Sequence, residues 1–144
     1  MGLFGKSNED KQRDWYNKGL ELFSIGQYEE AVKCLDTAIQ LNPGDAGAWN
    51  NKGIVLGVLG RFEESVKCLD KAILLNLGGS DAWTNKGNSL NSLGRHEEAV
   101  ECLDTAIRLN PEDSDAWHNK GIALKELGRG EEAEQCFAKS KELE

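Results

Sequence analysis

The sequence predicts an all-α protein in which one pair of helices is repeated four times, giving about eight helices in 144 residues. The first observation is that successive tryptophans lie 34 residues apart, at Trp15, Trp49, Trp83 and Trp117. The second is that the segments 29–43 and 97–111 are identical except at two positions. The third is that apolar residues within each period recur at spacings of three and four, which is the period of an α-helix.

The repeat also predicts where each helix begins and ends. A glycine follows the first helix of every repeat (Gly26, Gly60, Gly94 and Gly128), and glycine readily adopts the positive φ with which many helices end. Pro43 and Pro111 close repeats one and three, because proline cannot continue the helical hydrogen-bond ladder. The expected helices are 11–25, 28–41, 46–59, 62–75, 80–93, 96–109, 114–127 and 130–142. The repeats are 12–45, 46–79, 80–113 and 114–144. They are expected to form a single domain, 11–144, after a flexible leader, 1–10.

Two further patterns concern the ends and the contacts of the helices. Asp45, Ser80 and Ser114 stand just before first helices, where a side-chain oxygen accepts from free amide groups. Small residues are predicted to let the two helices of a repeat approach closely, since a glycine inside a helix costs about 1 kcal/mol relative to alanine. These pairs are Gly19 with Ala31, Gly53 with Ser65, Gly87 with Ala99, and Gly121 with Ala133.

Composition excludes several classes of partner. Lysine and arginine total 17 against 25 aspartates and glutamates, so the formal net charge is −8, which argues against binding to nucleic acid or an anionic membrane. No apolar run approaches the roughly 20 residues of a membrane span. The four cysteines are expected to be free, half-buried thiols, because equivalent residues of stacked repeats lie too far apart for disulfides. No metal or other cofactor is expected, and the row of thiols favours a reducing, cytoplasmic location.

The 34-residue helix–turn–helix period, with its phased tryptophan, glycine and alanine residues and its closing prolines, resembles the tetratricopeptide repeat (TPR) family. The resemblance implies a right-handed α-solenoid whose concave groove is lined by the first helices. It implies a scaffold or adaptor that binds a protein or peptide, as an extended segment or a helix, and it implies no enzyme activity.

The family's groove positions and the asparagine of each repeat give the candidate binding residues. They are Tyr16, Asn17, Leu20, Asn50, Asn51, Ile54, Thr84, Asn85, Asn88, His118, Asn119 and Ile122. Phe23 and Val58 are groove positions as well, so the first half of the groove is apolar, whereas the third repeat is rich in asparagine. A groove of this kind suits a segment with an apolar end.

The equivalent asparagines, Asn17, Asn51, Asn85 and Asn119, have two interpretations. A carboxamide both donates and accepts, so the four can bind a peptide backbone without reading its sequence, or each can bond locally. Some family members hold the carboxylate of a chaperone tail with a clamp of Lys, Asn and Arg. Tyr16, Asn50, Thr84 and His118 occupy the clamp's first lysine position here, so a heat-shock chaperone tail is not expected.

A lysine follows each tryptophan by three residues, at Lys18, Lys52, Lys86 and Lys120. These lysines either lay their stems on the indoles or form a cationic rail for acidic partners, and we favour the first interpretation.

Two hypotheses concern larger parts of the chain. Leu77-Gly78-Gly79, which replaces the closing proline of repeat two, is expected to act as a hinge. The alternative function is a self-associating module, a homo-oligomer formed through an uncapped C-terminal edge that carries Leu127, Phe137, Ala138 and Leu143.

Overall fold

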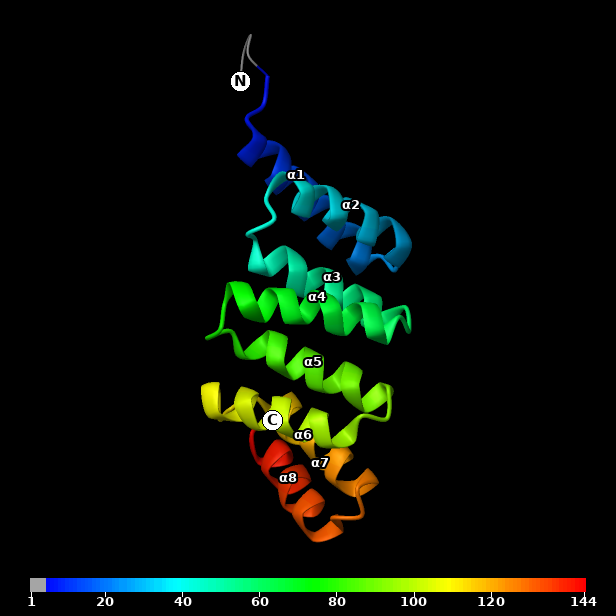
Figure 1. The fold of residues 1–144 in the computed structure, drawn as a ribbon, viewed down its shortest axis with the longest axis vertical. Helices are drawn as coiled ribbons and strands as arrows, with labels where there is room; N and C mark the ends of the chain where they lie inside the picture. The colour runs from blue at the N-terminus through cyan, green and yellow to red at the C-terminus, as the bar shows by residue number, and fades with distance from the viewer. Residues whose placement is uncertain (1–4) are drawn as a thin grey trace. The chain divides into compact units, whose positions relative to one another are not determined.

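The computed structural model describes residues 5–144 and contains, over that range, eight α-helices and no strand (Figure 1). The chain divides into two compact units, residues 1–75 and 76–144. Unit 1 contains α1 (Asn8–Ser24), α2 (Tyr28–Leu41), α3 (Ala46–Val58) and α4 (Phe62–Leu75). Unit 2 contains α5 (Ser80–Ser92), α6 (His96–Leu109), α7 (Ser114–Glu126) and α8 (Gly130–Glu142). The predicted all-α class is confirmed, and the single domain 11–144 stays a prediction.

The first helix begins earlier than the sequence predicts. Ser7 caps α1 by accepting a hydrogen bond from the backbone amide of Asp10 at 3.1 Å, and Glu9 and Asp10 place negative charge in the first turn. Residues 8–10 are therefore helical, although they were expected to belong to the flexible leader. Residues 1–4 of that leader lie outside the described residues.

The turn inside each hairpin has the form that the glycines predict. Gly26, Gly60, Gly94 and Gly128 have φ of 78–81°. The amide after each glycine donates back to a carbonyl five residues earlier, as from Arg61 to Leu56 at 2.9 Å. This bond satisfies a carbonyl that the helix end would leave unpaired, and it folds the second helix back along the first.

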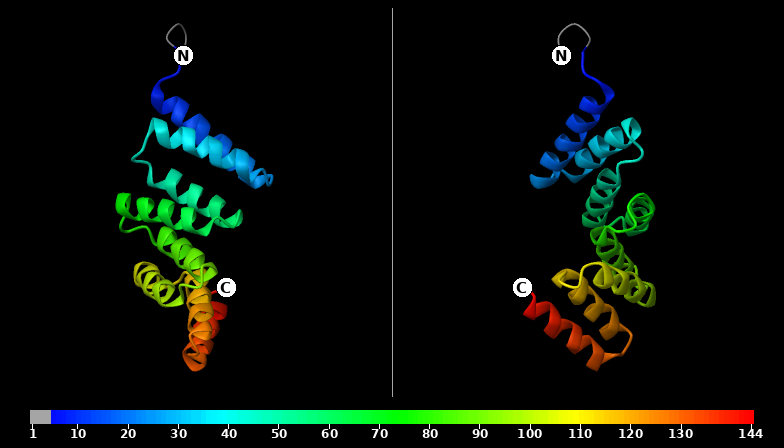
Figure 2. Two further views of the ribbon diagram at one scale, coloured as in Figure 1. Left: turned by 45° about the vertical axis from the view of Figure 1, so that its right-hand side comes forward. Right: turned by 90° about the vertical axis from the view of Figure 1, so that its left-hand side faces the viewer.

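The predicted glycines do lie against the other helix of their hairpin. Their nearest contact, however, is a leucine or phenylalanine side chain and not the predicted alanine or serine. A Cβ on Gly19, Gly53 or Gly87 would lie 2.5–2.9 Å from the Leu35, Leu69 or Leu103 side chain, respectively. The predicted partners Ala31 and Ser65 contribute a backbone carbonyl oxygen, which lies 3.4 Å from the Cβ position of Gly19 and of Gly53, respectively. In the last hairpin, a Cβ on Gly121 would meet the Phe137 ring at 2.6 Å. The views of Figure 2 show the paired helices of each hairpin side by side.

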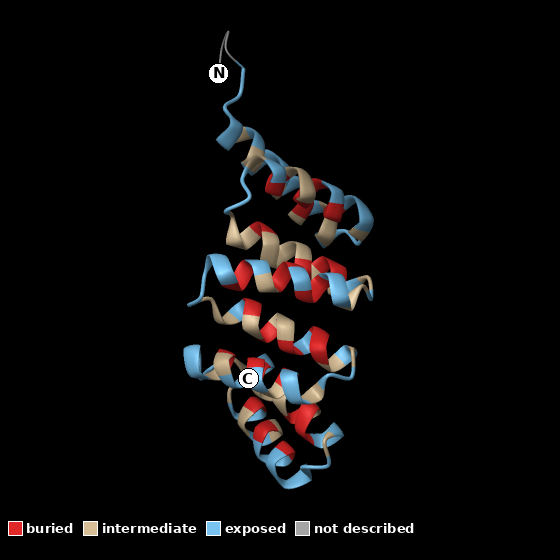
Figure 3. Cartoon of the chain, viewed as in Figure 1, coloured by how far each residue is buried: buried red, intermediate tan, exposed pale blue. Residues whose placement is uncertain are grey.

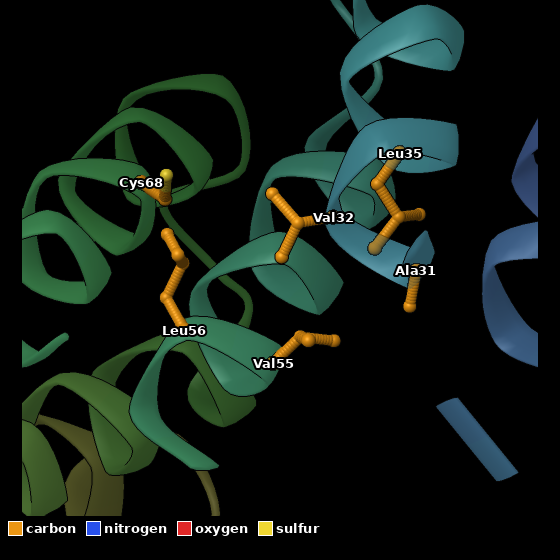
Figure 4. Packing of buried hydrophobic residues seen from close by; sticks show 6 residues of the cluster. All are labelled: Ala31, Val32, Leu35, Val55, Leu56 and Cys68. Atoms are coloured by element: carbon orange, nitrogen blue, oxygen red, sulfur yellow. The ribbon is translucent and has the colours of Figure 1, made fainter. Parts of the chain in front are cut away.

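Each unit has its own apolar core. In unit 1, side chains from α2, α3 and α4 point toward one another (Figure 4). These residues are Ala31, Val32, Leu35, Val55, Leu56 and Cys68. In unit 2, Leu124, Ala133 and Cys136 form a smaller cluster, against which Val100, Trp117 and Phe137 pack. Buried residues follow one stripe of each helix, and exposed residues cover the opposite stripe (Figure 3).

The first helices of repeats two and four begin with aspartate caps. Asp45 and Asp113 each accept a hydrogen bond, at 3.2 Å, from the amide three residues later. The expectation that Ser114 caps α7 is wrong, because Asp113 does so and Ser114 is the first helical residue. Ser80 is likewise the first residue of α5, and Gly79 occupies the cap position without a side-chain hydrogen bond.

Candidate functional site

The candidate binding residues of unit 1 lie on α1 and α3, two helices that contact each other. We call this set the unit 1 face. It consists of Tyr16, Asn17, Leu20, Asn50, Asn51 and Ile54. Asn17 is exposed and the other five are half-buried. On α3, the residues at intervals of four (Asn50, Ile54 and Val58) form one uncharged stripe that ends in Val58, which is 51% exposed.

A hydrogen bond joins Tyr16 of α1 to α3. The Asn51 amide nitrogen donates to the Tyr16 hydroxyl oxygen at 2.7 Å. Burial raises the pKa of Tyr16, and the negative charge of Asp45 raises it further, so the phenol stays protonated. Asp45 also accepts from the Gln12 amide at 2.7 Å. Asn51 therefore has a hydrogen-bond partner in the neighbouring repeat, and the two interpretations of the asparagines stay open.

The candidate residues of unit 2 lie on α5 and α7, which also contact each other. We call this set the unit 2 face. It consists of Thr84, Asn85, Asn88, His118, Asn119 and Ile122. Asn88 and His118 are exposed, and Asn85, Asn119 and Ile122 are half-buried. The set is more polar than the unit 1 face.

Thr84 and His118 both contact protein within unit 2. Thr84 is only 6% exposed, and its hydroxyl donates to Asp113 at 2.7 Å, so it joins α5 to the cap of α7 instead of offering surface. The His118 ring lies 5.4 Å from the Phe137 ring, centre to centre. The Thr84 hydroxyl is therefore hydrogen-bonded within unit 2, and the His118 ring packs against that of Phe137.

Asn91 of α5 is not among the candidate binding residues, and it connects three elements of unit 2. Its amide nitrogen donates to the Asn119 carbonyl oxygen at 2.9 Å. Its amide oxygen lies 3.1 Å from His96 Nδ1, which therefore carries the proton. The signal in the sequence is that Asn91 and His96 both depart from the residues at equivalent positions in repeats one and two.

The lysines lie on the tryptophans, as the interpretation that we favoured predicts. Their Nζ atoms are 5.4–5.9 Å from the indole centres in all four repeats. Lys52 also pairs with Asp36 at 2.5 Å, and Lys120 with Asp104 at 2.6 Å, which joins α2 to α3 and α6 to α7. The charges of Lys52 and Lys120 are therefore already balanced by aspartates.

Among residues 5–144, no group of three or more His, Cys, Asp or Glu side chains is arranged to hold a metal ion. Within the same range, none of the helices has the length and apolar character that crossing a bilayer requires. All four cysteines are buried and free. Burial raises the pKa of the Cys68 and Cys136 thiols, which lowers their reactivity.

The hairpin geometry and its period agree with comparisons to known families. A family model described as Tetratricopeptide repeat matches residues 13–45 and 80–113. A second model of the same description matches residues 34–67 and 102–135. The chain belongs to the tetratricopeptide repeat family. A search of curated proteins gave no match.

Solved TPR structures resemble the chain over most of its length. The crystal structure of MamA has 25% identity and a TM-score of 0.85, covering 92% of this chain and 77% of that one. The Arabidopsis OM64 TPR domain has 24% identity and a TM-score of 0.81, covering 83% and 98%. The first TPR of Spaghetti (RPAP3), bound to the HSP90 peptide SRMEEVD, has 22% identity and a TM-score of 0.81, covering 88% and 99%. These likenesses establish a TPR solenoid fold.

Proposed function

We propose that this TPR chain is a protein-binding scaffold and that the unit 1 face, extended by Val58, holds an uncharged, apolar peptide segment. The observation that carries the proposal is the stripe Asn50–Ile54–Val58 on α3, in which Val58 is 51% exposed, together with the half-buried Leu20 on the contacting helix α1. Apolar side chains of a partner gain burial against Ile54 and Val58.

The residues present argue against an acidic tail as the ligand. The Spaghetti domain is bound to an HSP90 peptide that ends in EEVD, a segment with three acidic side chains. In this chain the position of the clamp's first lysine holds Tyr16 in repeat one and Asn50 in repeat two, neither of which carries positive charge. An anionic peptide therefore lacks a compensating charge at these positions.

Fluorescence polarisation with short labelled peptides tests the proposal. Uncharged peptides rich in leucine, isoleucine and phenylalanine should bind, and SRMEEVD should not. Val58→Asp should weaken binding by about tenfold or more, because it places a charge in the apolar contact. Leu74→Asp is the matched control, since Leu74 is 73% exposed and lies on α4, a helix that carries none of the residues of this face. Absence of binding, or equal effects of both variants, would overturn the proposal.

Light scattering over a concentration series distinguishes the proposed scaffold from the alternative, a self-associating module. A monomer at every concentration, together with peptide binding, supports the scaffold. A mass that rises with concentration and falls when Phe137 is replaced by Asp would favour assembly through the edge of α8.

A further inference from the structure

The start of α5 differs from the starts of α3 and α7, although all three occupy the same point of the repeat. Asp45 and Asp113 cap α3 and α7 through hydrogen bonds to the amides of Ala48 and Ala116, respectively. Gly79 stands at this position before α5 and supplies no side-chain bond. The first turn of α5 therefore lacks the acceptor that stabilises its two counterparts.

The tryptophan of the same repeat, Trp83, also lacks the hydrogen bond that the equivalent tryptophans make. Trp49 Nε1 donates to the Pro43 carbonyl oxygen at 2.8 Å, and Trp117 Nε1 donates to that of Pro111 at 2.9 Å. Within residues 5–144, Trp83 Nε1 is buried and has no hydrogen-bond partner. A buried, unpartnered donor loses its bond to water on folding without replacing it, which favours states in which it is solvated.

The loop before α5 also differs from the other two loops in its side chains. Its backbone keeps the turn of the other loops, with Gly79 N donating to the Asn76 carbonyl oxygen at 3.1 Å. The Asn42 side chain accepts from the second amide along its loop, at 3.1 Å, as Asn110 does at 3.2 Å. Asn76 instead directs its amide nitrogen toward Gly79, 3.0 Å from where a Cβ would lie. Leu77 is 68% exposed, so it adds little packing.

We propose that residues 76–83, the loop together with the first turn of α5, form a local opening segment that unfolds and recloses while α6, α7 and α8 stay folded. In the open state the Trp83 N–H bonds to water, and the Gly78-Gly79 pair gains more backbone entropy than other residues would. This inference does not depend on the proposed function.

Native-state hydrogen exchange, measured by NMR on the full chain, tests the proposal. The indole N–H of Trp83 and the amides of residues 83–86 should exchange about tenfold or more faster than the same groups at residues 49–52 and 117–120. The amides in the middle of α6 should keep their protection. Equal rates at the three tryptophans would overturn the proposal.

A repair variant and its reverse supply matched controls. Leu77→Pro/Gly79→Asp restores the pattern of residues 43–45 and 111–113, and it should slow Trp83 exchange to the rate at Trp49 and Trp117. Pro111→Leu/Asp113→Gly should create fast exchange at Trp117. Glu112→Gly, which changes the same loop but keeps its proline and its cap, should not. Fast exchange at Trp83 in a folded repair variant, or unchanged exchange at Trp117 in the reverse variant, would contradict the proposal.

Discussion

Gly87 lies where α5 comes closest to α6. A Cβ at this position would be 2.5 Å from Leu103 Cγ, and Leu103 is completely buried. Alanine favours a helix by about 1 kcal/mol over glycine. The steric overlap between the added Cβ and the Leu103 side chain should cost more than this gain. We expect Gly87→Ala to lower the free energy of unfolding by about 1–3 kcal/mol, measured by urea denaturation.

Gly130 is the matched control for this substitution. It is the first residue of α8, it is exposed, and no atom lies within 4 Å of where its Cβ would be. Gly130→Ala should therefore leave stability unchanged or raise it by up to about 1 kcal/mol. A Gly87→Ala protein as stable as the Gly130→Ala protein would show that the helices can separate at little cost.

The tryptophans supply a second prediction at this scale. Trp117→Phe should cost about 0.5–1.5 kcal/mol more than Trp83→Phe, because only the former removes a hydrogen bond, that to the Pro111 carbonyl. Both changes lose similar ring volume and similar contact with a lysine. Thermal unfolding of the two variants measures the difference, and a larger loss of stability at Trp83 would contradict it.

Periodicity predicts which residues are equivalent but not which partners they find. Asn51 bonds to Tyr16, and tyrosine occurs at that position in the first repeat alone. Thr84, at the same position in repeat three, bonds to Asp113 and is buried. The candidate face could therefore be located from sequence, whereas the local roles of Asn51 and Thr84 depend on differences between repeats.

At the scale of the helix, the carboxylate of Asp113 accepts two hydrogen bonds. One carboxylate oxygen accepts from the Ala116 amide and the other from the Thr84 hydroxyl. Asp113→Ala should destabilise the protein by about 1–2 kcal/mol, as loss of a cap does. A double-mutant cycle with Thr84→Val, followed by chemical denaturation, should give a coupling energy of about 0.5 kcal/mol or more. Strict additivity would show that the bond between α5 and α7 contributes nothing.

Helix ends were the least predictable elements. Asp113 and Ser114 are adjacent, and both residue types are good caps, so the sequence offers two starts for α7. The structure selects Asp113, whose second oxygen has a partner on α5. At α1, Ser7 and the acidic Glu9 and Asp10 extend the helix beyond the apolar pattern from which its start was inferred. The positions of all eight helices, in contrast, followed from the period and the phased glycines.

The second helix of repeat three begins with an exposed ion pair that predicts a pH effect. Arg95 binds Glu98 three residues later, and its hydrogen bond lowers the pKa of the Glu98 carboxyl. Because the folded-state pKa lies below the unfolded one, the pair stabilises the fold above the usual carboxyl pKa, and that contribution is lost as pH falls through the lowered value. An NMR titration should show the Glu98 pKa rising in Arg95→Gln. An unchanged value would exclude Arg95 as the cause.

At the scale of the whole molecule, the two compact units predict uneven unfolding. Helices contact their near neighbours along the chain, so the effect of a substitution should remain largely within its unit. Gly87→Ala should accelerate hydrogen exchange at Leu103 and Leu124 of unit 2 more than at Leu35 and Leu56 of unit 1. Equal acceleration in both units would support the single cooperative domain expected from the sequence.

The boundary between the units falls between Leu75 and Asn76, next to the Leu77-Gly78-Gly79 segment expected to be a hinge. A uniform period cannot mark such a boundary, since by itself it describes four equivalent hairpins. The sequence signal for this boundary is a local departure from the repeat, in which Gly79 replaces the aspartate cap and Leu77 replaces the proline. The hinge itself remains a prediction.

Each hairpin contains one free, buried cysteine at the same register, Cys34, Cys68, Cys102 and Cys136. A thiol in this setting meets an alkylating reagent when its own hairpin opens, so the chain carries four chemical reporters without any engineered label. Mass spectrometry of partially alkylated protein would rank the hairpins by how often each one opens. The same experiment, repeated with a candidate partner present, would show which hairpins that partner holds closed.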